Sequence, residues 1–135
     1  MLPECRAPAL AHVDMMFHVF CVLGHGVGLD AAARGMGLAG KTKGMKGELA
    51  PVLWARGERE KVLGYVAQDV RATLEVAQAC EGCGELRWVA RSGMVRCMAL
   101  GEGWLTVVDA LRLPLPDTSW MASPWNREKF TGWMG

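Results

Sequence analysis

The stretch EREKVLGYVAQDVRATLEVAQA, residues Glu58 to Ala79, carries the clearest periodic pattern in this chain of 135 residues. Its apolar side chains recur every three or four residues, which is the spacing of one face of an α-helix. Glycine bounds the pattern on both sides, with Gly57 before it and Gly82 after it. We therefore predict one long helix, with its apolar positions at Val62, Val66, Val70, Leu74 and Ala77.

Two polar residues of this predicted helix form a candidate site. Tyr65 and Asp69 are four positions apart, so they project from the same face, one turn from each other. A carboxylate is a ligand for a divalent cation, and a phenol one turn earlier is placed to orient a water molecule against a phosphate. The structural alternative is a half-buried tyrosine beside a solvated aspartate. The spacing by itself leaves both readings open.

The residues around this pair resemble a known motif. Leu63 to Leu74 is similar to motif III of the DnaQ-like (DEDDy) 3′–5′ exonucleases of the RNase H-like superfamily, which include the proofreading domains of B-family DNA polymerases. Upstream, Asp14, Leu29 to Leu38 and Gly40-Lys41 look like that family's connection between motifs II and III. The resemblance covers about residues 12–78.

This resemblance implies two-metal hydrolysis of a phosphodiester bond, with several carboxylates binding two Mg²⁺ or Mn²⁺ ions. It implies that Asp69 is a metal ligand and that Tyr65 is a catalytic residue that orients the attacking water. Motif I, an Asp-x-Glu, and the aspartate of motif II have no counterpart in the sequence, and the family gives Asp14 no core role. One carboxylate does not hold two hard cations. We therefore expect a fragment that alone binds no metal and has no exonuclease activity.

A basic, glycine-rich loop precedes the predicted long helix. Gly40 to Gly47 contains Lys41, Lys43 and Lys46. Glycine lets the backbone approach a phosphate closely, and lysine neutralises its charge. In the family that the motif resembles, this loop lies close to the nucleic acid. We expect the three lysines to contact single-stranded nucleic acid, and an ordinary solvated loop is the alternative.

The cysteines indicate a reducing compartment. The chain has five, an odd number, and its N-terminus lacks the charged and apolar segments of a secretory signal. We therefore expect free thiols and a cytoplasmic location. Cys80 and Cys83 have the spacing of a zinc knuckle, and Cys97 follows on a strand-like segment. Because no fourth ligand is evident, we expect no structural zinc.

The composition excludes several classes of protein. With 51% apolar residues the chain is not disordered, and its net charge of +1 indicates no partner. The longest apolar block, Met15 to Leu23, is much shorter than the roughly 20 residues that cross a bilayer. We therefore expect this block to form a buried helix and the protein to have no membrane contact.

The remaining pattern predicts an α+β fold, a truncated RNase H-like domain that is mainly helical. Residues 1–84 form the helical, exonuclease-like part with motif III. Residues 85–135 add an antiparallel hairpin, Leu86–Ala90 with Met94–Leu100, and an irregular extension that contains Trp120, Trp125 and Trp133. We expect this extension to pack on the rest of a single domain, because exposed tryptophans favour aggregation.

A fragment of this kind would lack the central strands of the sheet and would expose the apolar surface that packs on them. We therefore expect a homodimer, formed through Met15–Leu23 and the long helix. The alternative function is a non-catalytic, homo-oligomeric module that binds nucleic acid or protein.

Overall fold

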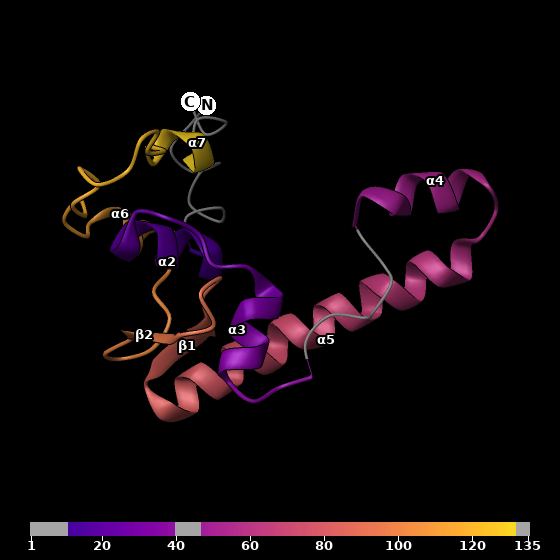
Figure 1. Cartoon of the computed structure of the whole chain (residues 1–135), viewed down its shortest axis with the longest axis horizontal. Helices are drawn as coiled ribbons and strands as arrows, with labels where there is room; N and C mark the ends of the chain where they lie inside the picture. Colours follow the sequence, from indigo (N-terminus) through magenta and orange to yellow (C-terminus); the bar gives the residue numbers. More distant parts are fainter. Residues whose placement is uncertain (1–10, 40–46, 132–135) are drawn as a thin grey trace. The chain divides into compact units, whose positions relative to one another are not determined.

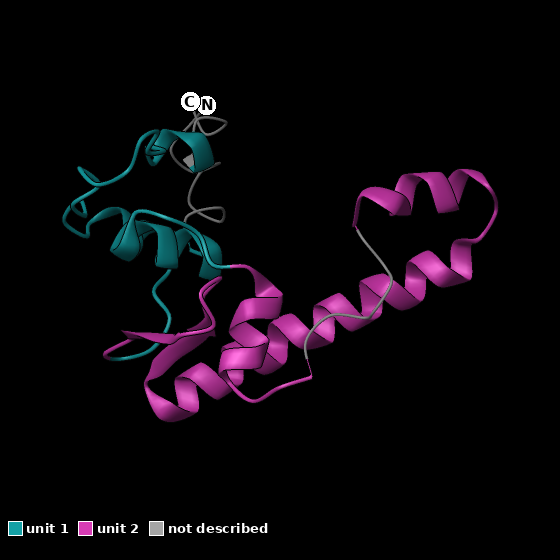
Figure 2. Cartoon of the chain, in the orientation of Figure 1, with its two compact units in different colours: residues 1–27, 102–135 teal, residues 28–101 magenta. Residues whose placement is uncertain are grey.

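The computed structural model describes residues 11–39 and 47–131, which fall in two compact units (Figure 2). Unit 1 consists of Met1–Val27 with Glu102–Gly135, and unit 2 consists of Gly28–Gly101. The hairpin that follows residue 84 packs on the helices of unit 2. Helices together with a two-stranded antiparallel sheet confirm the α+β class.

Unit 1 contains the helices α2 (Met15–Leu23), α6 (Val107–Leu111) and α7 (Glu128–Thr131) (Figure 1). The Asp14 side chain caps α2 by accepting the backbone N–H of Phe17 at 3.1 Å. Gly24 ends this helix in the left-handed conformation that glycine adopts without strain. The helix predicted over Met15–Leu23 is therefore confirmed with the same bounds.

The core of unit 1 lies between α2 and α6. Its fully covered side chains are Phe17, Cys21, Val107 and Ala110. Phe130 of α7 packs against this core, and its ring centroid is 4.7 Å from that of Phe20. The exposed apolar side chains of α2 are Met16 and Val22, which keep 50% and 38% of their surface, so the pairing of this helix with another copy stays a prediction.

The C-terminal extension is attached to unit 1 by Arg127 rather than by tryptophan. Its guanidinium donates to three backbone carbonyls, those of Leu111, Pro114 and Cys21, at 3.1 to 3.3 Å. Trp120 and Trp125 stay 67% and 53% exposed, and Trp133 lies outside the described residues. These backbone contacts of Arg127 join the extension to the rest of unit 1, and the Trp120 and Trp125 indoles are not buried there.

His18 is a buried polar group in the same unit. Its Nδ1 accepts the backbone N–H of Leu105 at 3.1 Å, and its ring meets the Trp104 ring edge-on. The proton of the neutral ring is therefore on Nε2. Burial lowers the pKa of His18 below its usual 6.5, because the charged ring would be poorly solvated there.

Unit 2 is built around one long helix, which is the one that the sequence predicts. Its elements are α3 (Leu29–Gly35), the short 3₁₀ helix η1 (Gly47–Leu49), α4 (Ala50–Ala55), α5 (Arg59–Cys83), β1 (Glu85–Val89) and β2 (Val95–Ala99). The long helix α5 runs four residues beyond the expected Ala79 and ends at Gly84, whose φ is +76°.

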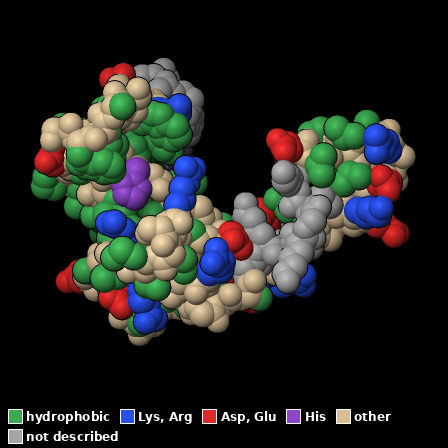
Figure 3. Space-filling model, in the orientation of Figure 1, with side chains coloured by type: hydrophobic (Ala, Val, Ile, Leu, Met, Phe, Trp, Pro, Cys, Tyr) green, Lys and Arg blue, Asp and Glu red, His purple; other side chains and the backbone are tan. Residues whose placement is uncertain are grey.

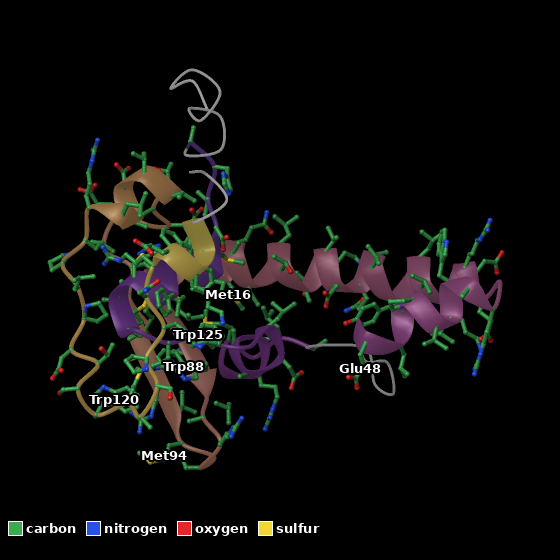
Figure 4. The ribbon with its side chains drawn as sticks, turned by 90° about the horizontal axis from the view of Figure 1, so that it is seen from above. Met16, Glu48, Trp88, Met94, Trp120 and Trp125 are labelled. Carbon is green, nitrogen blue, oxygen red and sulfur yellow. The ribbon has the colours of Figure 1, made fainter. Side chains whose placement is uncertain are left out.

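The expected hairpin is confirmed to within one residue at the ends of its strands. β1 pairs antiparallel with β2, and Leu86 lies opposite Met98. Leu86, Trp88 and Met98 are buried, and Met94 lies at the tip of the hairpin (Figure 4). β1 also packs on α3, where Gly35 lies directly against the backbone at Arg87 and Trp88. No side chain fits at Gly35, so this glycine sets how closely the helix approaches the strand.

Most of the apolar positions that the sequence predicts for the buried face of α5 are exposed, and the helix packs through a neighbouring face. The helix contacts α3, α4 and β1, and it buries Val62, Ala72, Val76 and Cys80. Val66, Val70 and Leu74 are 47% to 61% exposed. The error arises because both rows have helical spacing, and periodicity alone does not say which one faces the neighbouring elements.

Replacing two glycines of unit 2 by alanine should change stability in opposite directions. Gly35→Ala should lower the free energy of unfolding by roughly 1–3 kcal/mol, because the new methyl group overlaps the Arg87 carbonyl. Gly64→Ala should raise it by about 0.5–1 kcal/mol, because Gly64 has open space around it inside α5. Urea unfolding of both variants checks this, and equal effects would contradict the close contact.

The stability of unit 1 should decrease as the pH falls below about 6.5. His18 has a lowered pKa in the folded state, so the unfolded chain binds the proton first and is favoured by acid. Stability from this group is complete above pH 6.5 and is lost as the pH falls toward the lower, folded pKa. Unfolding between pH 5 and 7, followed by tryptophan fluorescence, measures the slope. His18→Asn should remove it, and His12→Asn, at an exposed position, should keep it.

Candidate functional site

Tyr65 and Asp69 lie one turn apart on α5, as the sequence predicts. Both side chains are half-buried, and both lie on the helix face that also carries Val62, Ala72 and Val76. The helical repeat of about 100° per residue puts positions 62, 65, 69, 72 and 76 within one broad sector. The candidate residues are therefore on the packed side of the helix and not on its solvated side.

The Tyr65 hydroxyl lies beside the end of the basic loop. A Cβ atom built on Gly47 would be 3.5 Å from Tyr65 Oη, so the phenol is against the backbone where η1 begins. Lys41, Lys43 and Lys46 lie outside the described residues, and the structure does not place their side chains. The fold nevertheless brings the residue that follows Lys46 next to the candidate catalytic tyrosine.

Within residues 11–39 and 47–131, neither the Tyr65 hydroxyl nor the Asp69 carboxylate has a hydrogen-bond or ion-pair partner. The Asp69 backbone carbonyl accepts the Thr73 hydroxyl at 2.7 Å, and this bond does not involve the side chain. The carboxylate is consequently available to a cation or to a donor from outside this part of the chain.

Asp69 does not belong to a cluster of three or more metal-ligand side chains in the described part of the chain. No group of three His, Cys, Asp or Glu side chains there is arranged to hold a metal ion. Asp14, in unit 1, is used as the cap of α2. A single carboxylate is too small a ligand set for a hard cation that takes six or more oxygen ligands.

The cysteine pair at the end of α5 is occupied by structural contacts. Burial, together with the neighbouring Cys83, raises the pKa of the Cys80 thiol to about 11. The Cys83 thiol donates to the Glu85 carbonyl at 3.3 Å. Without a metal, Cys80 is therefore a neutral thiol at physiological pH. The described cysteines, Cys21, Cys80, Cys83 and Cys97, are all free thiols.

Sequence reasoning missed one feature of the site region, the exposed apolar side of α5. It begins at Leu63, whose side chain is 57% exposed, and not at Val62, which is buried. A signal was available, because Leu63, Val66, Val70 and Leu74 also keep helical spacing. Choosing between two adjacent rows requires knowing where the partner helices lie.

Comparison with known proteins leaves the family open: no family model, no curated protein and no solved structure matches the chain. The structure adds one negative result. None of the helices in the described ranges combines the length and apolar character that crossing a bilayer requires.

Proposed function

We propose that residues 12–78 are the C-terminal part of a DnaQ-like 3′–5′ exonuclease domain with an RNase H-like fold. The observation that carries the proposal is the arrangement on α5. Tyr65 and Asp69 lie side by side on its half-buried face, without partners in the described part of the chain. The polar ends of both side chains remain accessible to solvent, so a carboxylate and a phenol one turn apart are available to a cation and a phosphate.

In the proposed site, Asp69 would be one of the carboxylates that hold Mg²⁺ or Mn²⁺. Such ions activate a water molecule and stabilise the oxygen that leaves phosphorus. The Tyr65 hydroxyl, one turn earlier, would accept or donate a hydrogen bond that directs this water toward the phosphate. Both roles use the i, i+4 spacing, which sets the two polar ends within one turn of α5.

The proposal requires further carboxylates from outside these 135 residues. Asp69 alone does not make a two-metal site. They would come from an Asp-x-Glu segment and a second aspartate, encoded upstream in frame or on a separate chain. The chain alone would then bind no metal and hydrolyse nothing. The free thiols of Cys21, Cys80, Cys83 and Cys97 agree with a cytoplasmic location for the complete enzyme.

A second candidate is a non-catalytic, homo-oligomeric binding module. The observation that favours it is the amount of apolar surface that unit 2 leaves exposed. Figure 3 shows hydrophobic side chains gathered over α4, where Val52 and Trp54 are each 45% exposed. The apolar side of α5 adds to this surface. Exposed apolar surface of this extent is typical of proteins that bind a partner.

Adding the missing carboxylates should produce a metal-dependent exonuclease. The chain extended by its upstream in-frame sequence, or mixed with a separately encoded N-terminal half, should release nucleotides from the 3′ end of single-stranded DNA in Mn²⁺. In this assembly Asp69→Asn should lower the rate by more than about 100-fold, because a metal ligand is lost. Tyr65→Phe should lower kcat by about 100-fold with little change in KM, because the water is misplaced.

The matched control is Glu75→Gln, which removes an exposed carboxylate from the same helix and should leave the rate unchanged. The proposal predicts no turnover by the 135-residue chain alone. Turnover by that chain, lost in Asp69→Asn, would contradict the fragment assignment. An extended chain that lacks Asp-x-Glu and does not hydrolyse DNA would favour the binding module.

The three loop lysines should make DNA binding strongly dependent on salt. Changing Lys41, Lys43 and Lys46 to glutamine should reduce the slope of log affinity against log salt by about 2, since each single-strand phosphate contact contributes about 0.7. Fluorescence anisotropy with labelled single-stranded DNA between 50 and 200 mM salt, roughly the usual working range, measures this. An unchanged slope would mean that the loop is only solvated.

A further inference from the structure

One face of α5 is an exposed row of aliphatic side chains. Leu63, Val66, Val70 and Leu74 keep between 47% and 61% of their surface exposed. Their spacing of three, four and four residues puts them on one side of the helix over about 17 Å. Isolated exposed leucines and valines are common on proteins, but a continuous row marks a surface that another element covers.

The described elements of unit 2, which exclude residues 40–46, leave this row exposed. α3, α4 and β1 pack on the neighbouring face of α5, where Val62, Ala72 and Val76 are buried. Figure 4 shows α3 and α4 on the same side of α5. The row is turned by roughly a quarter to a third of a turn from that packed face, given about 100° per residue.

Charged residues of opposite sign end the row. Arg59 lies one turn before Leu63, and Glu81 lies one turn after Ala77; both are exposed. The Arg59 guanidinium is over the Trp54 ring, 5.0 Å from its centroid, which holds it at the helix end. We call the full set the α5 row: Arg59, Leu63, Val66, Val70, Leu74, Ala77 and Glu81.

The spacing of the α5 row is the same in both directions from Val70. Toward either end the next members lie four, then three, then four residues away. The row advances 22 residues in six turns, about 3.7 per turn, which is close to the 3.6 of a straight helix. On a straight helix the row drifts by only about 40° over its length and so stays on one face, and its 11-residue period corresponds to a slight right-handed supercoil.

We propose that the α5 row binds the α5 row of a second copy, with the two helices antiparallel. A two-fold axis at Val70 then brings Val70 against its own copy and Val66 against Leu74 of the other chain. The same axis brings Leu63 against Ala77 and Arg59 against Glu81. Each of these pairs occurs twice in the dimer, as an isologous interface requires, and only the Val70–Val70 pair on the axis occurs once.

The charges select this orientation. Antiparallel pairing places Arg59 opposite Glu81 at both ends of the interface. Parallel pairing would place Arg59 against Arg59 and Glu81 against Glu81, and juxtaposed like charges are unfavourable. The apolar centre supplies the attraction, and the charged ends set direction and register.

This interface is independent of the proposed exonuclease site, since neither Tyr65 nor Asp69 belongs to the α5 row. The interface is tested by measuring molecular mass and cross-linking between copies, whereas the proposed function is tested by measuring the release of nucleotides. Failure of one therefore leaves the other unaffected.

A charge exchange tests the pairing of the ends. The full chain should be a dimer by light scattering at about 100 μM, in the range of weak interfaces of this small size. Arg59→Glu and Glu81→Arg should each weaken dimerisation at least about 10-fold at low salt, and the double variant should restore it. Glu75→Arg, an exposed charge reversal on another side of α5, should have no effect. Failure of the double variant to recover would overturn the antiparallel register.

Cysteine cross-linking tests the axis itself. In a background with Cys83 and Cys97 changed to serine, Val70→Cys should form a disulfide between copies on mild oxidation, identified by peptide mapping. Leu63→Cys should not link to itself, because its partner is Ala77. Self-linking at both positions would indicate parallel helices and overturn the proposal.

Val70→Glu should give monomers that keep the far-UV circular dichroism of the unchanged chain. A dimer that survives Val70→Glu would place the interface elsewhere. A chain that stays monomeric at all concentrations would leave the row to a different partner, such as the sheet of an N-terminal half. Either result would overturn pairing between copies.

Discussion

The packing of a single face of α5 determines how unit 2 is assembled. Val62, Ala72, Val76 and Cys80 are buried on that face, and α3, α4 and β1 all contact the helix. A straight helix presents its side chains at fixed angles, so burying one sector decides which residues are half-buried and which are exposed. Gly35 supplies the second constraint, because its missing side chain lets α3 lie directly on the β1 backbone.

This division of faces connects the candidate site with the proposed interface. Tyr65 and Asp69 lie half-buried on the packed face, and Gly47 places the end of the basic loop beside the Tyr65 phenol. The aliphatic row is on an adjacent side, which the described elements of unit 2 leave exposed. One helix thus carries two surfaces that the described residues of unit 2 leave accessible. The first is the polar pair Tyr65 and Asp69, and the second is the aliphatic row.

Two polar side chains, Arg127 and His18, make hydrogen bonds to the backbone that join segments of unit 1. Arg127 donates to carbonyls of α2, of α6 and of the segment after it, and so fixes the C-terminal extension. His18 accepts the Leu105 N–H and must stay neutral to do so. Hydrogen bonds to the backbone position these segments, and the aromatic contacts of Phe130 complete the core.

The sequence by itself determined the local structure, because helices and turns follow from spacing, caps and glycines. It predicted the helix Met15–Leu23, the long helix, the hairpin and the placement of Tyr65 and Asp69 one turn apart. Only the tertiary structure decided which face of α5 is buried, since Val62 and Leu63 both begin rows of helical spacing. The roles of Arg127, His18 and Gly35 were likewise not predictable, because their contacts join segments far apart in the chain.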